Sequence, residues 1–377
     1  MYMIKNPKKN KIKSNFIFTA VLSGRATGQI NTAKFLISIF ESNNDINNLL
    51  ILEQPHLSKY FVLNWVIFLL KNIKIFFLRK IDSIYFINNR TKKSLWLREM
   101  LPLFLAKISK AKVYYHIVGN DFIPFLNSLN IIERNIFLAP ITNYRFNFVV
   151  LGISMKKDII KSLANYGIVV NDDQFIELPA FLSRKSISDS EKFFQNNEVE
   201  GELCIGFMSN LMFEKGINDY LEAINKYMSI NPHAKCWVAG PKIRGVNYEL
   251  LDELVSKNII TYYPFIDDEQ KWRILSKTQL FILPTFYKIE YLPLAMVDAM
   301  LCGCKVVTCD SGEISRYINE YNGKIVEKRN AKAIVQAIKD YTLTSHSHDR
   351  KKIRDSVVLL FSEEKYRARI SKMLAKY

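Results

Sequence analysis

The sequence predicts an α/β protein with two doubly wound parallel sheets in tandem, and three observations support this fold class. The 377 residues exceed one ordinary core and suit two domains of roughly 150–200 residues. Apolar runs of strand length recur, about six in each half, with helix-length segments between them. The polar stretch Ser183–Gly201 separates the halves and is interpreted as the interdomain linker. In such sheets ligands bind beyond the carboxyl ends of the strands, so we expect the site in a cleft between the domains.

The expected strands are near-continuous apolar runs, which are typical of parallel sheets covered by helices on both faces. In the first half they are Phe16–Leu22, Leu49–Leu52, Ile84–Ile87, Val113–Val118, Phe148–Leu151 and Phe175–Leu178. In the second half they are Leu203–Met208, Cys236–Ala239, Ile259–Tyr263, Leu280–Leu283, Lys305–Cys309 and Lys324–Val326.

Positive charge is concentrated in the first part of the chain and in its tail, within a net charge of +17. Residues 1–150 hold 21 Lys and Arg against 7 Asp and Glu; residues 151–350 hold 24 against 26, and residues 351–377 hold 8 against 3. A charge that served solubility alone would not segregate in this way. The pattern predicts an anionic partner, either a membrane or a nucleic acid. No helix-turn-helix, zinc or RNA-binding motif is found, so no nucleic acid is expected.

The composition is that of a globular protein, with 49% hydrophobic and 24% charged residues. The five cysteines lack zinc-ligand spacing, so we expect no metal, no disulfide and a reduced, cytoplasmic protein. The N-terminus lacks the apolar core and cleavage site of a signal peptide. The longest uncharged apolar stretch, Tyr60–Leu70, is about half of the ~20 residues that a membrane span needs.

The segment Pro284–Glu313 carries the strongest candidate site. Pro293 suits the start of a predicted helix over Leu294–Leu301, whose N-terminus can receive a phosphate. Glu290 lies just upstream and Asp298 lies on the helix, eight residues later. These acids can grip hydroxyl groups on either side of a diphosphate. The alternative is a surface acid in a loop and a helix acid in a salt bridge.

Three further strand ends carry weaker candidates. Lys215 lies at the turn before a helix that starts near Gly216, where its ammonium can point at a diphosphate. Gly24 and Gly28 flank the turn after the first strand and would let a ligand approach the backbone closely. His116 closes another strand that is expected to point into the same cleft. Each has an ordinary structural alternative: a loop lysine, a turn and a core histidine.

In their order along the chain, these pieces resemble the retaining GT-B glycosyltransferases of the family 4 type, the glycosyl transferases group 1. The resemblance covers nearly the whole chain and is strongest from Leu203 to Val326. That family carries E-G-F-P-L-x-x-x-E-A-M-A-x-G-x-P-V-V, and this chain carries EYLPLAMVDAMLCGCKVV in register. The departure is Asp298, which replaces the second Glu of the motif with a side chain one methylene shorter.

The resemblance implies a role for each candidate. Glu290 contacts the donor sugar, Asp298 holds the nucleotide ribose, and the helix start at Pro293 and Leu294 receives the diphosphate. Lys215 matches the lysine that contacts the diphosphate, and His116 matches a histidine that faces sugar and acceptor. Donor binding is further assigned to Gly24, Gly28 and Asn210. Asn210 stands where the family has an arginine, a loss for which Lys242 or Arg244 can substitute. The DSGE segment, Asp310–Glu313, keeps only Gly312 of the family's Gly-Gly-x-x-E.

The implied reaction moves a sugar from a nucleotide-sugar to a saccharide acceptor with retention of anomeric configuration and without a metal. Glu290, Lys215 and His116 are the implied catalytic residues. The acceptor is expected to be lipid-linked, in the biosynthesis of a bacterial surface polysaccharide such as capsule, O-antigen or lipopolysaccharide. The alternative is a catalytically inactive GT-B scaffold protein at the membrane.

The expected domains are an acceptor-binding, membrane-facing domain over residues 1–182, a nucleotide-sugar-binding domain over residues 202–355 and a closing helix over residues 356–377 that packs back on the first domain. Within the first domain, the apolar and aromatic segment Leu57–Lys80 ends in four cations. It is either domain core or an interfacial helix on anionic lipid at the inner face of the cell membrane.

Overall fold

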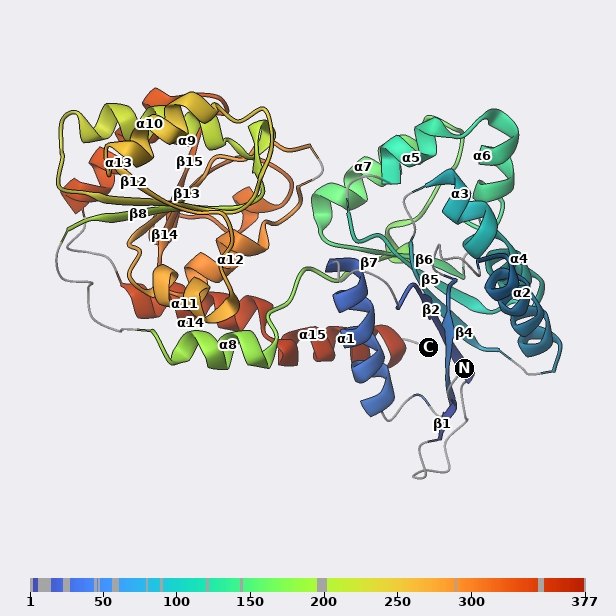
Figure 1. The fold of residues 1–377 in the computed structure, drawn as a ribbon. Coiled ribbons are helices and arrows are strands. Elements are labelled where there is room, and N and C mark those ends of the chain that lie inside the picture. The colour runs from blue at the N-terminus through green and yellow to red at the C-terminus, as the bar shows by residue number, and fades with distance from the viewer. Residues whose placement is uncertain are drawn as a thin grey trace. The chain divides into compact units, whose positions relative to one another are not determined.

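The computed structural model describes residues 3–5, 15–22, 28–43, 46, 48–55, 61–78, 81–88, 91–119, 122–142, 145–194, 202–288, 290–344 and 349–375. The chain divides into two compact units (Figure 1). Unit 1 comprises Met1–Pro179 and Arg367–Tyr377, and unit 2 comprises Ala180–Tyr366. Each unit is an α/β fold with its own sheet and its own hydrophobic core.

Unit 1 is built on a seven-stranded sheet of order β1-β3-β2-β4-β5-β6-β7. Only β1 runs antiparallel, pairing with β3, and the other described strands pair in parallel. Their bounds are β1 Met3–Lys5, β2 Asn15–Ala20, β3 Asn48–Glu53, β4 Ser83–Ile87, β5 Lys112–His116, β6 Phe146–Val150 and β7 Phe175–Glu177.

Alternate residues of a strand point to opposite faces of the sheet, and in unit 1 both sets are apolar. Helices therefore cover both faces. On one face Phe40 of α1 (Gly28–Ser42) packs on Phe16 and Tyr85, with ring centroids 4.9 and 5.2 Å apart. On the other face Tyr115 packs on Phe122 and Phe137, at 6.3 and 6.2 Å. The elements of this second face include α2 Phe61–Leu78, α3 Lys92–Ser94, a π-helical turn Leu95–Glu99, α4 Met100–Ile108, α5 Phe122–Ser128 and α6 Ile131–Leu138. Helix α7 spans Ile153–Ala164, and a short turn covers Asp172–Gln174.

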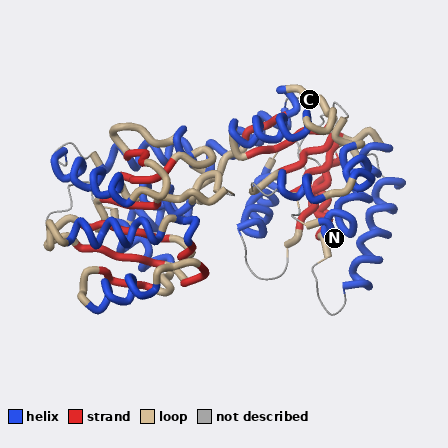
Figure 2. Tube along the Cα trace, turned by 90° about the horizontal axis from the view of Figure 1, so that it is seen from above, coloured by secondary structure: helices blue, strands red, loops and turns tan. Residues whose placement is uncertain are grey.

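Unit 2 is built on a six-stranded parallel sheet of order β12-β10-β8-β13-β14-β15. The strands are β8 Cys204–Met208, β10 Lys235–Ala239, β12 Ile260–Tyr263, β13 Leu280–Leu283, β14 Lys305–Cys309 and β15 Gly323–Val326. A small separate ladder pairs β9 Leu211–Met212 with β11 Lys242–Arg244. Figure 2 shows the strands of each unit with the helices around them.

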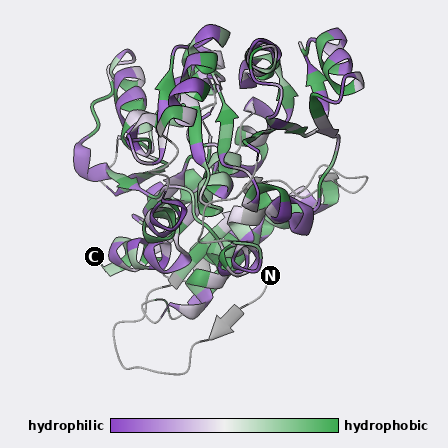
Figure 3. Ribbon diagram, turned by 90° about the vertical axis from the view of Figure 1, so that its left-hand side faces the viewer, coloured by the Kyte–Doolittle hydropathy of each residue, from purple (hydrophilic) through white to green (hydrophobic). Residues whose placement is uncertain are grey.

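The helices of unit 2 are α8 Arg184–Glu191, α9 Ile217–Met228, α10 Tyr248–Ser256, α11 Asp268–Ser276, α12 Leu294–Leu301, α13 Ala331–Thr344 and α14 Arg350–Phe361. Short helical turns cover Phe213–Lys215 and Ile314–Arg316. The apolar strands lie between helices whose outer faces are polar (Figure 3). Helix α15, Glu363–Ala375, begins in unit 2 and continues in unit 1.

All twelve predicted strands are present, with ends shifted by at most a few residues, so the doubly wound prediction is confirmed. The sequence missed β1, β9 and β11. These strands have two or three residues each, too few for an apolar run to mark them. The strand predicted over Val113–Val118 ends at His116.

The interpretation of Ser183–Gly201 as an interdomain linker is wrong for its first half. Helix α8 occupies this part, and the Ser183 side chain caps it by accepting from the Ser186 N–H at 3.0 Å. Arg354 of α14 donates to the Ser190 hydroxyl at 3.0 Å, so the helix is part of unit 2. The helix is mostly polar and packs through Ser190 as well as Ile187, so its composition alone resembles that of a linker. Residues 195–201 lie outside the described residues.

Candidate functional site

Lys215 and Glu290 meet beyond the carboxyl ends of two neighbouring strands of unit 2. Lys215 follows β8 and β9 in the turn Phe213–Lys215, and Glu290 follows β13. The Lys215 Nζ forms an ion pair with Glu290 Oε2, and each side chain is only 14% exposed. The Lys215 ammonium also lies 5.1 Å from the centroid of the Tyr287 ring. Two residues that lie 75 positions apart in the sequence thus form one charged pair.

Close backbone contacts hold the turn that carries Lys215 against the loop after β13 that carries Glu290. Gly216 has a φ of +78°, and a Cβ there would lie 2.4 Å from the Pro284 carbonyl oxygen, so only glycine fits. The Phe286 N–H donates to the Glu214 carbonyl at 2.9 Å. Gly312, in the DSGE segment, approaches from the other side, where a Cβ would lie 2.4 Å from the Glu290 carbonyl oxygen. This close packing explains why Gly312 is the residue of that segment that matches the family pattern.

The N-terminus of α12 lies next to Glu290 in the chain. The helix spans Leu294–Leu301 as predicted, but Pro293 takes the cap position, with a ψ of 119°, rather than the first helical position. No side chain caps this end within the described residues, and Leu294 is 55% exposed. An uncapped helix N-terminus leaves backbone N–H groups and a positive dipole end for an anion.

Asp298 is already paired in this structure. Its Oδ2 lies 3.1 Å from the Nζ of Lys271, on α11, and the Lys271 ammonium lies 4.0 Å over the Trp272 ring. Burial raises the pKa of Asp298, and the neighbouring ammonium opposes that rise. Asp298 therefore forms the kind of salt bridge that the sequence analysis gave as the alternative to contact with a ligand hydroxyl. The sequence did not indicate Lys271, because the order of residues along α11 does not predict which neighbouring helix the Lys271 side chain contacts.

The two cations expected to replace the family arginine have other partners. Asn210, which stands at that arginine's position, is exposed between β8 and β9. The Lys242 Nζ pairs with Asp252 at 3.1 Å, and the Arg244 guanidinium pairs with Glu214 at 2.8 Å. Among the described residues, Lys215 is thus the cation that pairs with Glu290, whereas Lys242 and Arg244 pair elsewhere.

His116 is the last residue of β5 in unit 1 and is buried, with 1% of its surface exposed. Its Nδ1 lies 2.9 Å from the Tyr85 hydroxyl, and its Nε2 is buried without a hydrogen-bond partner among the described residues. Burial lowers the pKa of His116 to about 3, so the imidazole is neutral at physiological pH. Of the two candidate glycines in this unit, Gly28 is the first residue of α1 and Gly24 lies outside the described residues.

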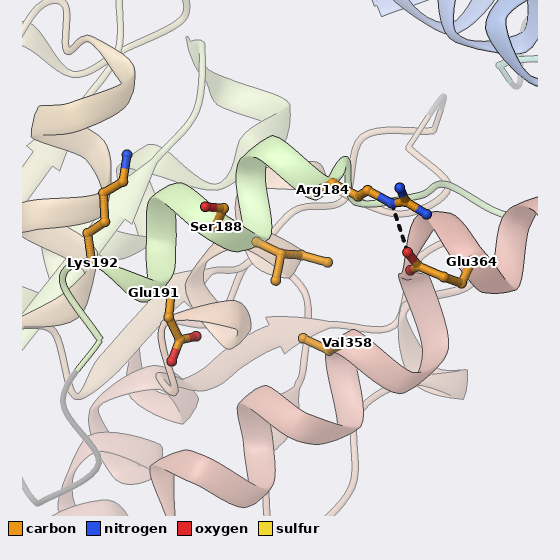
Figure 4. A pocket seen from close by; sticks show the side chains of 7 residues that line it. Arg184, Ser188, Glu191, Lys192, Val358 and Glu364 are labelled. Carbon is orange, nitrogen blue, oxygen red and sulfur yellow. Dashed lines mark hydrogen bonds and ion pairs between the residues drawn. The ribbon is translucent and has the colours of Figure 1, made fainter.

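Two surface hollows of unit 2 lie away from the predicted site residues. Figure 4 shows the larger, about 580 Å³, where α8 faces α14 and the start of α15. Ile187 and Val358 form its apolar part, and Arg184 pairs with Glu364 at its rim at 2.9 Å. The smaller, about 420 Å³, follows α14 and includes Tyr321 and Leu359. Neither is lined by a residue that the sequence singled out.

No group of three or more His, Cys, Asp or Glu side chains in the described part of the chain is arranged to hold a metal ion. Across the described ranges, no helix has the length and apolar character needed to cross a membrane. All five cysteines are free thiols.

The family of the second unit follows from residues 188–356, which match the model of glycosyl transferases group 1. Unit 2 is a glycosyl transferases group 1 domain. The match starts inside α8, in agreement with the place of that helix in unit 2. It contains Asn210, Lys215, Glu290 and Asp298, so the predicted resemblance to glycosyl transferases group 1 is confirmed over the segment where the motifs lie. No curated protein matches the chain in sequence.

Solved structures extend the similarity from unit 2 to the whole chain. Alr3699/HepE from Anabaena, in complex with UDP, is 14% identical, with 96% of this chain and 100% of that chain covered and a TM-score of 0.67. A glycosyltransferase from Rickettsia africae is 17% identical, with 97% and 99% covered and a TM-score of 0.65. Sucrose-phosphate synthase from Thermosynechococcus elongatus is 15% identical, with the same coverage and a TM-score of 0.62. The chain has the GT-B fold.

Proposed function

We propose that the protein transfers a glycosyl group from a nucleotide-sugar to a hydroxyl of a saccharide acceptor, with retention of anomeric configuration. The observation that carries the proposal is the Lys215–Glu290 pair beside the uncapped N-terminus of α12, in a glycosyl transferases group 1 domain. The arrangement offers a cation and helix N–H groups to a diphosphate, and a carboxylate to sugar hydroxyls, at one edge of the sheet.

In this proposal, departure of the nucleoside diphosphate is the difficult step, because negative charge grows on the leaving oxygen. Lys215 and the N–H groups of the α12 start stabilise that charge, and preorganised donors of this kind are typically worth about 3–4 kcal/mol each. Glu290 accepts hydrogen bonds from the donor sugar and holds the anomeric carbon in place. The acceptor hydroxyl attacks from the leaving-group face and passes its proton to the departing phosphate. No protein nucleophile and no metal are needed.

We propose a uridine nucleotide as the first donor to test. Alr3699/HepE was solved with UDP, with UDP and glucose, and with UDP-glucose, and shares the fold of this chain over nearly its full length. Asp298, or Lys271 beside it, is then placed to contact the ribose, and Gly24, Gly28 and Asn210 stay candidates for donor binding. His116 is proposed to face the sugar and acceptor.

The acceptor is proposed to be a lipid-linked saccharide in bacterial surface polysaccharide biosynthesis, with the protein held peripherally at the inner face of the cell membrane. The support is the excess of 14 positive charges in residues 1–150, which favours an anionic surface.

A catalytically inactive scaffold is the second candidate, favoured by the pairing of Asp298 with Lys271 and by Asn210 at the arginine position. Restoring the family residues with Asn210→Arg and Asp298→Glu separates the two. An enzyme already turns over donor before these changes, whereas a scaffold shows no turnover until they are made.

The donor site is tested by thermal shift with UDP, GDP, ADP, CMP and their sugar conjugates, without metal and with EDTA. A ligand at 100 times its Kd stabilises the folded state by ~2.7 kcal/mol. We expect a shift with one nucleotide that persists in EDTA, is lost in Lys215→Gln and survives in Lys226→Gln, a change of an exposed lysine on α9. The absence of a shift with every nucleotide would contradict the proposal.

A further inference from the structure

Half of the large hydrophobic residues that are exposed in the described part of the chain lie on three neighbouring segments of unit 1: α2, the π-helical turn with α4, and α6. Twelve of the 24 fall between residues 62 and 136. Six are on α2, namely Val62, Leu63, Val66, Ile67, Leu70 and Ile73, with 38–70% of their surface exposed. The others are Trp96 in the π-helical turn, Phe104 and Ile108 on α4, and Ile131, Ile132 and Ile136 on α6. We call these twelve residues the apolar face.

The three segments are joined side by side on one face of the unit 1 sheet. The Trp65 indole N–H of α2 donates to the Leu97 carbonyl in the π-helical turn at 2.7 Å. The Lys107 ammonium of α4 donates to the Ala139 carbonyl, one residue past α6, at 3.1 Å. Figure 1 draws α2, α3, α4 and α6 along the same side of the unit. The twelve residues therefore lie on adjoining elements of the unit, whereas exposed apolar residues scattered singly would need no explanation.

Core packing does not account for this surface, because α2 has a separate buried side. Phe68, Asn72 and Ile75 face the interior, with 0–4% exposed, whereas Val62, Val66 and Leu70 recur on the other side at helical spacing. A helix that is apolar around most of its circumference needs an apolar environment on both sides. The sequence left two alternatives for Leu57–Lys80, domain core or a helix at a lipid interface, and the structure shows α2 with one side buried and the other side exposed.

The charges around the apolar face indicate the chemistry of its partner. Helices α2, α3, α4 and α6 and the π-helical turn together carry seven Lys and Arg and two Asp and Glu. Both acids have partners: Glu99 accepts from the buried Tyr115 hydroxyl at 2.6 Å, and Glu133 pairs with Lys92 at 2.9 Å. Lys71, Lys74, Lys93, Lys107 and Lys110 are exposed. An apolar surface with exposed lysines on the same elements is complementary to a bilayer with anionic headgroups.

We infer that the apolar face docks on an anionic lipid bilayer, with α2 lying in the plane of the interface and its lysines at the headgroups. The inference deepens the proposed function by naming the surface that brings unit 1 to a lipid-linked acceptor. Its measurement needs neither donor nor acceptor, so it can fail while the glycosyl-transfer proposal stands. Conversely, loss of nucleotide binding would leave it intact.

The test is co-flotation of the full chain with vesicles of phosphatidylcholine alone and of phosphatidylcholine with phosphatidylglycerol. We expect binding to the anionic vesicles, reduced at least about tenfold by Leu70→Gln with Phe104→Gln. Lys71→Gln with Lys74→Gln should lower binding to the anionic vesicles by about fivefold per lysine and leave neutral vesicles unaffected. The matched control is Val169→Gln with Ile230→Gln, which changes equally exposed apolar residues elsewhere, at 86% and 59%.

Two outcomes would overturn the inference. One is binding to anionic vesicles that is equal in the wild type, the Leu70→Gln/Phe104→Gln variant and the control. The other is no vesicle binding together with a dimer in light scattering that this variant dissolves, which would assign the apolar face to a second copy of the chain. Thermal unfolding of the same variants without nucleotide, followed by circular dichroism, shows whether they remain folded. Quenching of Trp96 fluorescence by brominated lipid, lost in Trp96→Phe, checks that the face enters the bilayer.

Discussion

The Lys215–Glu290 pair holds opposite charges at the carboxyl edge of the second sheet, with most of both side chains out of water. Such a pair stabilises the fold only modestly, because desolvation offsets much of the attraction. Removing one partner lowers stability more, because the charge of the other partner is then poorly solvated and has no counter-charge. At the residue scale, the proposed function therefore makes this pair a link between stability and donor binding.

We predict that Lys215→Gln and Glu290→Gln each lower the turnover rate at least ~100-fold, because each removes a group that contacts the donor in the proposed transition state. Each single change should also lower the free energy of unfolding, by up to about 3 kcal/mol. The double variant should recover part of that stability and none of the activity. Urea unfolding and turnover on the same preparations check this. Near-normal turnover in either single variant would remove that residue from the mechanism.

His116 gives a second prediction at this scale, for pH dependence. Its folded pKa of about 3 lies below the unfolded value of roughly 6.5, so the unfolded chain binds the proton first as pH falls. The contribution of the buried neutral imidazole is fully present above pH ~6.5 and is lost towards pH ~3. Wild type should therefore lose about 2 kcal/mol more than His116→Gln between pH 7 and pH 5.

The measurement is the unfolding free energy of the two proteins at both pH values. Tyr85→Phe is the control, because it keeps the imidazole and should keep the pH slope while losing the hydrogen bond to Nδ1. Equal pH slopes for wild type and His116→Gln would show that His116 does not titrate as a buried group.

At the scale of elements, α14 joins the ends of two other helices through a buried arginine. Arg350 is 1% exposed and donates to the carbonyls of Ser276, Thr278 and Cys302, at 2.7, 3.0 and 2.6 Å. These carbonyls lie at the C-terminal ends of α11 and α12, where helices leave acceptors unpaired. The arginine thus fixes the two helices that carry Lys271 and Asp298.

Arg350→Met keeps an unbranched side chain and removes its hydrogen-bond donors, so three buried carbonyls lose a partner. We expect a loss of about 3 kcal/mol or more in unfolding free energy, since each unpaired buried group costs ~1–3 kcal/mol. Lys351→Met, a change of the exposed neighbour, should cost less than about 0.5 kcal/mol. Chemical denaturation measures both, and equal stabilities would contradict the assigned role.

At the scale of the whole molecule, the chain passes from unit 1 to unit 2 and returns through α15. Ile370 and Met373, in the part that belongs to unit 1, are 0% and 4% exposed, and Tyr114 of β5 donates to the Met373 carbonyl at 3.4 Å. The last helix is therefore part of the core of the first unit.

Ile370→Ala should destabilise unit 1 by about 2–5 kcal/mol, because it opens a cavity in a packed core. The nucleotide-dependent thermal shift of unit 2 should persist, since Ile370 belongs to the core of unit 1. Calorimetry with and without nucleotide checks both parts. The exposed Leu359→Ala, on α14, serves as the control. Loss of the nucleotide shift in Ile370→Ala would show that the units do not behave independently.

The sequence by itself determined the alternation of twelve strands with helices, since a strand buried on both faces must be apolar along its length. It also determined the Lys215, Glu290 and α12 segment as the candidate site, because a motif in register is a local property. Only the tertiary structure decided which charges meet. Lys215 finds Glu290, and Lys271 finds Asp298, through loops and helices far apart in the chain. It also decided which side of α2 is buried, because an apolar residue has the same sequence signature whether it faces a core or water.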